Sequence, residues 1–171
     1  MIVNDQGMSL QIASLKTPIG RLNLIADGEV LLGANFSSIK ALKESVDQSY
    51  LGSEFTSVKK IPGISPLIDN YFAGDITALN AIKVSQPGGE FSQAAWKSMR
   101  KVRVGTVISY SQLAEKAGSP KAVRAAGSAC AKNAIVLVVP CHRIVKTGGD
   151  LGNYAYGVNK KLWLLRHEGL Q

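Results

Sequence analysis

The sequence predicts a mixed α/β N-terminal domain over residues 1–85 and a mainly α-helical C-terminal domain over residues 86–171. Short apolar runs separated by turn residues dominate the first part, which is typical of strands. Apolar residues at helical spacing dominate the second part. Between them, Gln86-Pro87-Gly88-Gly89-Glu90 is the natural linker, because proline and paired glycines interrupt regular structure.

In the first part we expect a small sheet with helices. The predicted elements are strands over 10–14, 22–26, 30–36 and 80–84, and helices over 39–46 and 65–72. Asp27-Gly28 is the predicted hairpin turn, since glycine accepts positive φ. Ser65 is the expected N-cap of the second helix, with Pro66 as its first residue. This part contains no Cys and no His, so we interpret it as a scaffold.

The second part predicts three helices ahead of a buried run. They begin at Ser92, Ser111 and Ser119-Pro120, and end near Val102, Lys116 and Ala131. The apolar face of the first consists of Ala95, Trp96, Met99 and Val102. The other two, joined at Ala117-Gly118-Ser119, have the spacing of a helix-turn-helix, which presents its second helix to DNA.

That second helix carries few long side chains. Its small residues are Ala122, Ala125, Ala126, Gly127, Ser128 and Ala129, and Arg124 is its one long charge in mid-helix. A helix that recognises bases in the major groove needs several polar side chains. A bare helix favours close approach to a narrow groove, where Arg124 can fill the gap left by a displaced base. Tight helix–helix packing is the alternative interpretation.

The positive charge lies in the second half of the chain. Residues 1–86 carry 7 basic and 8 acidic side chains, whereas residues 87–171 carry 13 basic and 4 acidic ones. A half that basic usually binds a polyanion, most often nucleic acid, although a well-solvated surface is the alternative.

Several protein classes are excluded. The longest apolar run, Ala134 to Val139, is too short to span a membrane. The first six residues show no secretory signal pattern. Two cysteines cannot build a disulfide framework. We therefore expect a cytoplasmic protein that has no membrane partner.

The candidate chemical site follows the apolar run, at Pro140-Cys141-His142-Arg143. A cysteine there is most often a core residue. However, Pro140 fixes the backbone before the sulfur, and the basic Arg143 and Lys146 favour the thiolate. His142 can accept the thiol proton, and His167 and Glu168 are candidates to orient it. Cys130 lacks such neighbours and is interpreted as structural.

Val139-Pro140-Cys141-His142-Arg143-Ile144 resembles the active-site signature of the O6-alkylguanine-DNA alkyltransferases, a family of DNA repair proteins. The resemblance covers about residues 91–169 and includes, in order, Phe91, Trp96, Gly105 to Tyr110, Gln112-Leu113-Ala114, Gly118-Ser119-Pro120, Arg124-Ala125, Gly127, Asn133, Gly152-Asn153-Tyr154 and Leu164 to Gly169. It implies a ribonuclease H-like N-terminal domain with a small antiparallel sheet and helices. It also implies a winged helix-turn-helix C-terminal domain.

The resemblance implies DNA repair by irreversible, single-turnover alkyl transfer to Cys141. The substrate would be O6-alkylguanine, and less readily O4-alkylthymine, in duplex DNA bound through the minor groove with the damaged base flipped out. The implied partner is double-stranded DNA and the implied state a monomer, with cooperative binding along DNA left open. No cofactor is implied. Some members hold a structural zinc in the first domain, but this chain has no Cys or His before Cys130, so we expect no metal.

The resemblance also implies residue roles. Cys141 would be the nucleophile, His142 and Glu168 a relay that takes its proton through water, Asn133 a brace, and Tyr110 a proton donor to the guanine ring. The implied DNA-binding residues are Tyr110, Arg124, Ala125, Ala126, Gly127 and Ser128. The implied substrate pocket comprises Val139, Pro140, Arg143, Ile144, Gly152, Asn153, Tyr154, Ala155 and Lys161.

The chain departs from the family pattern at Arg103, Ala126, Ala134 and Tyr156. Tyr156 stands in the predicted lid, which leaves the range of accepted alkyl groups open. Three alternatives remain: a non-catalytic lesion-binding relative, a winged-helix regulator and a cysteine hydrolase. The first typically has Trp in place of the motif cysteine, so Cys141 favours transfer.

Overall fold

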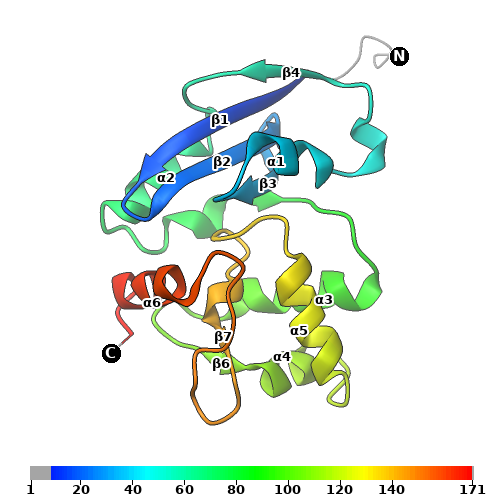
Figure 1. Cartoon of the computed structure of the whole chain (residues 1–171), viewed down its shortest axis with the longest axis vertical. Helices are drawn as coiled ribbons and strands as arrows, with labels where there is room; N and C mark the ends of the chain where they lie inside the picture. Colours follow the sequence, from blue (N-terminus) through cyan, green and yellow to red (C-terminus); the bar gives the residue numbers. More distant parts are fainter. Residues whose placement is uncertain (1–8, 171) are drawn as a thin grey trace. The chain divides into compact units, whose positions relative to one another are not determined.

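A computed structural model describes residues 9–170. The chain divides into two compact units, one ending at Pro87 and the other beginning at Gly88 (Figure 1). Within residues 9–170, no helix combines the length and apolarity needed to cross a bilayer.

The first unit is built on a five-stranded sheet of order β4-β1-β2-β3-β5. Its strands are β1 (Ser9–Thr17), β2 (Gly20–Asp27), β3 (Val30–Asn35), β4 (Glu54–Ser57) and β5 (Lys83–Val84). The three central strands are antiparallel, as predicted. The two edge strands pair in parallel, β4 with β1 and β5 with β3, so the sheet is mixed and the expectation of a purely antiparallel sheet is wrong.

The core of this unit follows from the alternation of apolar residues. Leu10, Ile12, Ile25 and Leu32 cluster with Leu42 of the short helix α1 (Ile39–Glu44). Every residue of β2 from Leu22 to Ala26 is buried, because β2 is the central strand of the sheet and is covered on both faces. A second helix, α2 (Ser65–Phe72), packs on β1.

Several predicted boundaries in this unit are wrong for local reasons. The β2–β3 turn is Gly28-Glu29, one residue later than predicted, with Gly28 at φ 60°. Of the predicted strand over 80–84, the first two residues belong to the 3₁₀ helix η3 (Ala78–Ala81), and only Lys83–Val84 form the strand β5. Ser65 is the first residue of α2 and does not cap it. Its hydroxyl instead accepts a hydrogen bond from the Ile61 N–H at 2.8 Å. The sequence analysis missed β4 and the 3₁₀ helix η2 (Gln48–Tyr50).

The second unit is mainly helical. It contains α3 (Glu90–Lys101), α4 (Tyr110–Lys116), α5 (Val123–Lys132), α6 (Val158–His167), the 3₁₀ helix η4 (Cys141–Arg143), and the two-residue strands β6 (Ile108–Ser109) and β7 (Ile144–Val145). Helices α3, α4 and α5 pack on one another. The indole N–H of Trp96 donates to the Ala129 carbonyl at 2.9 Å and ties α3 to α5.

The helix starts in this unit also differ from the predictions. Gly89 is the N-cap of α3, and Ser92 lies buried inside the helix. Ser109 caps α4 through a reciprocal pair of bonds with Gln112. Helix α5 begins at Val123, so the α4–α5 connection spans residues 117–122 and is longer than expected.

The buried Ser65 hydroxyl gives a stability prediction. Ser65→Ala leaves the buried Ile61 N–H without an acceptor and should lower the free energy of unfolding by about 1–3 kcal/mol. Urea unfolding measures this loss. Ser37→Ala, at an exposed serine, should change stability by less than about 0.5 kcal/mol. Equal effects of the two changes would contradict the role given to the Ser65–Ile61 bond.

Candidate active site

Cys141 opens η4 at the end of a tightly folded buried segment, and is itself only 7% exposed. Its N–H donates to the Val139 carbonyl at 2.8 Å. Asn133, just after α5, holds this segment from both ends: its amide donates to the same carbonyl at 2.8 Å, and its oxygen accepts the Ile135 N–H at 3.1 Å. Asn133 therefore fixes the backbone of the segment that leads to Cys141.

Behind Cys141, three side chains form a buried network. His142 Nε2 lies 2.8 Å from Glu168 Oε2. Arg143 donates twice to the same carboxylate, from Nε at 2.8 Å and from a terminal nitrogen at 3.1 Å, and once to the Val102 carbonyl at 2.8 Å. All three side chains are at most 6% exposed. The fold thus places Glu168 against two residues that precede it by 25 and 26 positions in the sequence.

The charges in this network define a proton acceptor. Burial alone raises the pKa of Glu168, but the hydrogen bonds from His142 and Arg143 and the charge of Arg143 outweigh burial and lower it to about 2. Burial lowers the pKa of His142, so its ring is neutral at pH 7. An ionised carboxylate only accepts hydrogen bonds, so the ring proton resides on Nε2. Nδ1 is then an unprotonated acceptor, and it is buried with no hydrogen-bond partner among the described residues.

The Cys141 thiol is protonated at rest. Burial raises the pKa of Cys141, while the Asn133 side chain and the charge of Lys161 oppose that rise. Lys161 is fully buried, and its ammonium donates to the carbonyls of Ile144 at 2.6 Å and Asn153 at 3.1 Å. The sequence predicted that nearby basic residues would favour the thiolate of Cys141. Desolvation by burial outweighs their effect and favours the neutral thiol. Reaction at this sulfur requires a base.

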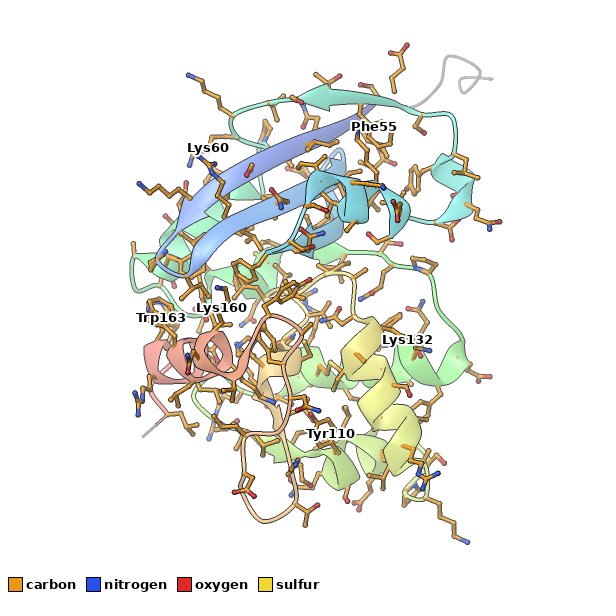
Figure 2. The ribbon with its side chains drawn as sticks, in the orientation of Figure 1. Phe55, Lys60, Tyr110, Lys132, Lys160 and Trp163 are labelled. Atoms are coloured by element: carbon orange, nitrogen blue, oxygen red, sulfur yellow. The ribbon has the colours of Figure 1, made fainter. Side chains whose placement is uncertain are left out.

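Cys141 lies at a cavity of about 660 Å³. The lining residues come from the start of α4, from α5, from η4 and from the loop after β7: Tyr110, Val123, Arg124, Gly127, Ser128, Cys130, Ala131, Cys141, Lys146, Asn153, Tyr154 and Ala155. Figure 2 shows Tyr110 between α5 and that loop. Arg124 is exposed, so the cavity has a cationic residue at its solvent side.

Other expected residues lie off the cavity wall. Ala126 is fully buried and faces the interior of the unit, and Ala125 does not line the cavity. The predicted pocket residues that do not line it are Val139, Pro140, Arg143, Ile144, Gly152 and Lys161. All of these except Gly152 are buried, and Arg143 and Lys161 are held by the hydrogen bonds described above. They support the site from behind.

The sequence analysis missed four cavity residues: Val123, Cys130, Ala131 and Lys146. Cys130, which was interpreted as structural, lines the same cavity as Cys141. Mainly through burial, its pKa is raised to about 12, so it is a neutral thiol. Helical spacing was the available signal, since Cys130 and Ala131 lie three and four residues after Gly127.

Two tyrosines meet the cavity differently. Burial is the main cause that raises the pKa of Tyr110 to about 12, so its hydroxyl is a donor at pH 7. The Tyr154 hydroxyl is buried with no partner in the described residues. The Tyr156 ring packs edge-on against Tyr154, with centroids 5.8 Å apart, and does not itself line the cavity. Among residues 9–170, no three His, Cys, Asp or Glu side chains gather as a metal site would require.

Comparisons with known proteins agree with this geometry. Residues 90–170 match the family model described as "6-O-methylguanine DNA methyltransferase, DNA binding domain". The methylated-DNA–protein-cysteine methyltransferase of Shigella flexneri is 36% identical over 91% of this chain and 93% of its own length. The Homo sapiens protein of that name is 33% identical over 96% of this chain and 83% of its own. The Mycobacterium tuberculosis OGT, crystallised in complex with DNA, superposes with a TM-score of 0.75 at 29% identity, covering 92% of each chain.

The buried network predicts a specific pH dependence of stability. The pKa of Glu168 falls from its usual 4.5 to about 2 on folding, so its stabilisation is complete above pH 4.5 and is lost as pH falls toward 2. The lowered pKa of His142 acts in the same direction below pH 6.5, since only the unfolded chain then takes up that proton.

We therefore expect Glu168→Gln to flatten the fall in unfolding free energy between pH 4.5 and 2. Glu115→Gln, a change at an exposed carboxylate on α4, is the matched control and should leave the slope unchanged. Urea titrations at a series of pH values provide the measurement. Parallel curves for all three proteins would rule out Glu168 as the main acid-sensitive group.

Proposed function

This chain belongs to the O6-methylguanine-DNA methyltransferase family, and on that basis we propose that Cys141 accepts the alkyl group. The protein repairs DNA by direct transfer from alkylated DNA to a cysteine of its own. The observation that carries the assignment is the position of Cys141: a protonated thiol at a cavity large enough to admit a base, with an ionised Glu168 and a neutral His142 behind it.

We propose the following proton path. The Cys141 thiol releases its proton through a water molecule to His142 Nδ1, whose acceptor lone pair is set by the Nε2–Glu168 bond. Glu168 stabilises the resulting imidazolium, and Arg143 keeps Glu168 ionised. A positive charge thus develops on His142 only while the thiolate exists, so the two charges compensate each other inside a buried site.

In the chemical step the Cys141 sulfur attacks the alkyl carbon in line with the bond to O6. The S–C bond forms, the C–O6 bond breaks, and its electron pair moves onto the guanine. Tyr110 donates a proton to the guanine ring as that negative charge develops, and is reprotonated from solvent. The products are a thioether on Cys141 and an unmodified guanine. A thioether has no leaving group that water can displace, so each molecule acts once.

Guanine recognition in this proposal relies on backbone groups. The carbonyls of Cys141 and Ile144 accept from the exocyclic amine, and the backbone near Ala155 addresses O6. The Ile144 carbonyl already accepts from Lys161 at 2.6 Å, and its second lone pair serves the amine. Tyr154 packs beside the alkyl group, with Tyr156 behind it.

DNA binding in this proposal belongs to the second unit. Arg124 enters the base stack in place of the flipped nucleotide, and the small residues around Gly127 allow α5 to approach the minor groove. The excess of basic residues over 87–171 supports this assignment. We propose a winged helix-turn-helix for this unit, a ribonuclease H-like scaffold for the first, and a monomeric cytoplasmic protein.

The decisive experiment detects the transferred group. The protein is incubated with duplex DNA carrying O6-methylguanine, and the peptide containing Cys141 is analysed by mass spectrometry. We expect one methyl group on Cys141, none in Cys141→Ser, and full transfer in Cys130→Ala. Tight binding to the lesion without a gain in mass would instead indicate a non-catalytic lesion-binding protein.

The role of Tyr110 has its own test. Tyr110→Phe should slow single-turnover transfer by roughly 10²-fold, since it removes a general acid, and should weaken DNA binding far less. Rapid-quench kinetics and fluorescence anisotropy measure the two effects. Tyr50→Phe, at a tyrosine of the first unit, is the control for loss of a hydroxyl. Equal losses of rate and affinity in Tyr110→Phe would contradict the donor role.

A further inference from the structure

Lys146 lines the cavity but has no part in the proposed proton path or alkyl transfer. It follows β7, is exposed, and lines the same cavity as Tyr110, Arg124 and Cys141. In the part of the chain from residue 9 to 170, no carboxylate forms an ion pair with it. Its charge is therefore available to a ligand at the cavity.

The fold places Lys146 beside Tyr110. Strands β6 and β7 are parallel and in register, with Ser109 opposite Val145. Tyr110 and Lys146 are the first residues after these strands, so the chain leaves the ladder at neighbouring positions. One residue further, the hydroxyls of Ser111 and Thr147 lie 3.4 Å apart and continue the pairing.

The side chains of Tyr110 and Lys146 both lie next to Gly152. A methyl group built on Gly152 would lie 3.2 Å from the Tyr110 hydroxyl oxygen and 3.4 Å from Lys146 Cγ. The aliphatic stem of Lys146 and the Tyr110 ring thus pack over one backbone position. The Lys146 N–H donates to the Asp150 carbonyl at 2.9 Å, and the Gly149 N–H donates to the Lys146 carbonyl at 3.0 Å, so a closed turn fixes the backbone of Lys146 (orange loop after β7 in Figure 1).

We propose that Lys146 binds a backbone phosphate next to the flipped nucleotide. This inference rests on the proposed function, in which Tyr110 donates to a ring nitrogen of the guanine. On the minor-groove side that nitrogen is N3, which lies beside the glycosidic bond, so the sugar and its phosphates are next to Tyr110. An exposed cation adjacent to Tyr110 is in position to meet a phosphate.

With Arg124 on α5 and Lys146 after β7, cations from two different elements then border the cavity. Arg124 fills the vacated place in the stack, and Lys146 holds the backbone of the nucleotide that has left it. The two residues hold the flipped state by different contacts.

The first test is the salt dependence of binding. A lysine–phosphate contact releases counterions, so Lys146→Gln should reduce the slope of log K against log salt by about 0.9. Lys146→Arg should restore the slope. Lys40→Gln, which removes an exposed lysine of α1 in the first unit, is the matched control and should leave it unchanged. A wild-type slope in Lys146→Gln would overturn the proposal.

The second test locates the phosphate. Duplexes carry a neutral methylphosphonate in place of the phosphate immediately 5′ or 3′ of O6-methylguanine, and binding is measured for wild type and Lys146→Gln. At one of the two positions, the methylphosphonate should weaken DNA binding by the wild-type protein and have no effect on DNA binding by the Lys146→Gln variant. The proposal would be overturned if, at both positions, the losses of binding free energy caused by the methylphosphonate and by Lys146→Gln were additive. Additive losses indicate groups that do not interact with each other.

These outcomes are separable from failure of the proposed function. The slope is also measured on an undamaged duplex, which requires no transfer. If Cys141 gains no methyl group yet Lys146→Gln loses one phosphate contact, the proposed transfer fails and the contact stands. If Cys141 is methylated and the slopes are equal, only the contact fails.

Discussion

The arrangement of the second unit depends on one buried carboxylate. Glu168 accepts hydrogen bonds from the side chains of His142 and Arg143, and thereby connects the end of α6 to η4. A buried anion is costly unless it is fully paired, so the network is stable only when both partners are in place. The same bonds orient His142 and leave its other nitrogen as an acceptor. The hydrogen bonds that stabilise this part of the fold therefore also orient the His142 ring for the proposed proton path.

A second constraint follows from placing the nucleophile out of water. Burial makes Cys141 a poor thiolate by itself. Asn133 and Lys161 partly counter this effect, and each does so while also holding backbone: Asn133 fixes the segment before Cys141, and Lys161 links Ile144 to Asn153 in the loop that borders the cavity. Buried polar groups thus hold the backbone on both sides of Cys141.

The sequence predicted the central hairpins, the helical second half and the motif around Cys141, because apolar alternation, glycine turns and the Pro-Cys-His-Arg run are local signals. It did not predict the parallel edge strand β4, whose four exposed residues have no apolar pattern. The helix starts predicted at Ser65 and Ser92 are wrong, because both serines are buried and neither is an N-cap. Whether a serine caps a helix depends on its tertiary surroundings, which the local sequence does not show. Cys130 and Lys146 were missed as cavity residues for a related reason: their neighbours come from other segments of the chain, and only the folded unit brings them together.

The burial of Cys141 has a consequence for how long an unused molecule lasts. Accessible thiolates react with peroxides and disulfides, whereas Cys141 is only 7% exposed and its thiol is protonated at rest. A protein that reacts once must keep its sulfur reduced until a damaged base arrives. Desolvation of Cys141 makes a proton acceptor necessary for repair, and it also slows oxidation of the thiol. The unreacted protein therefore keeps its reactive cysteine until it meets damaged DNA.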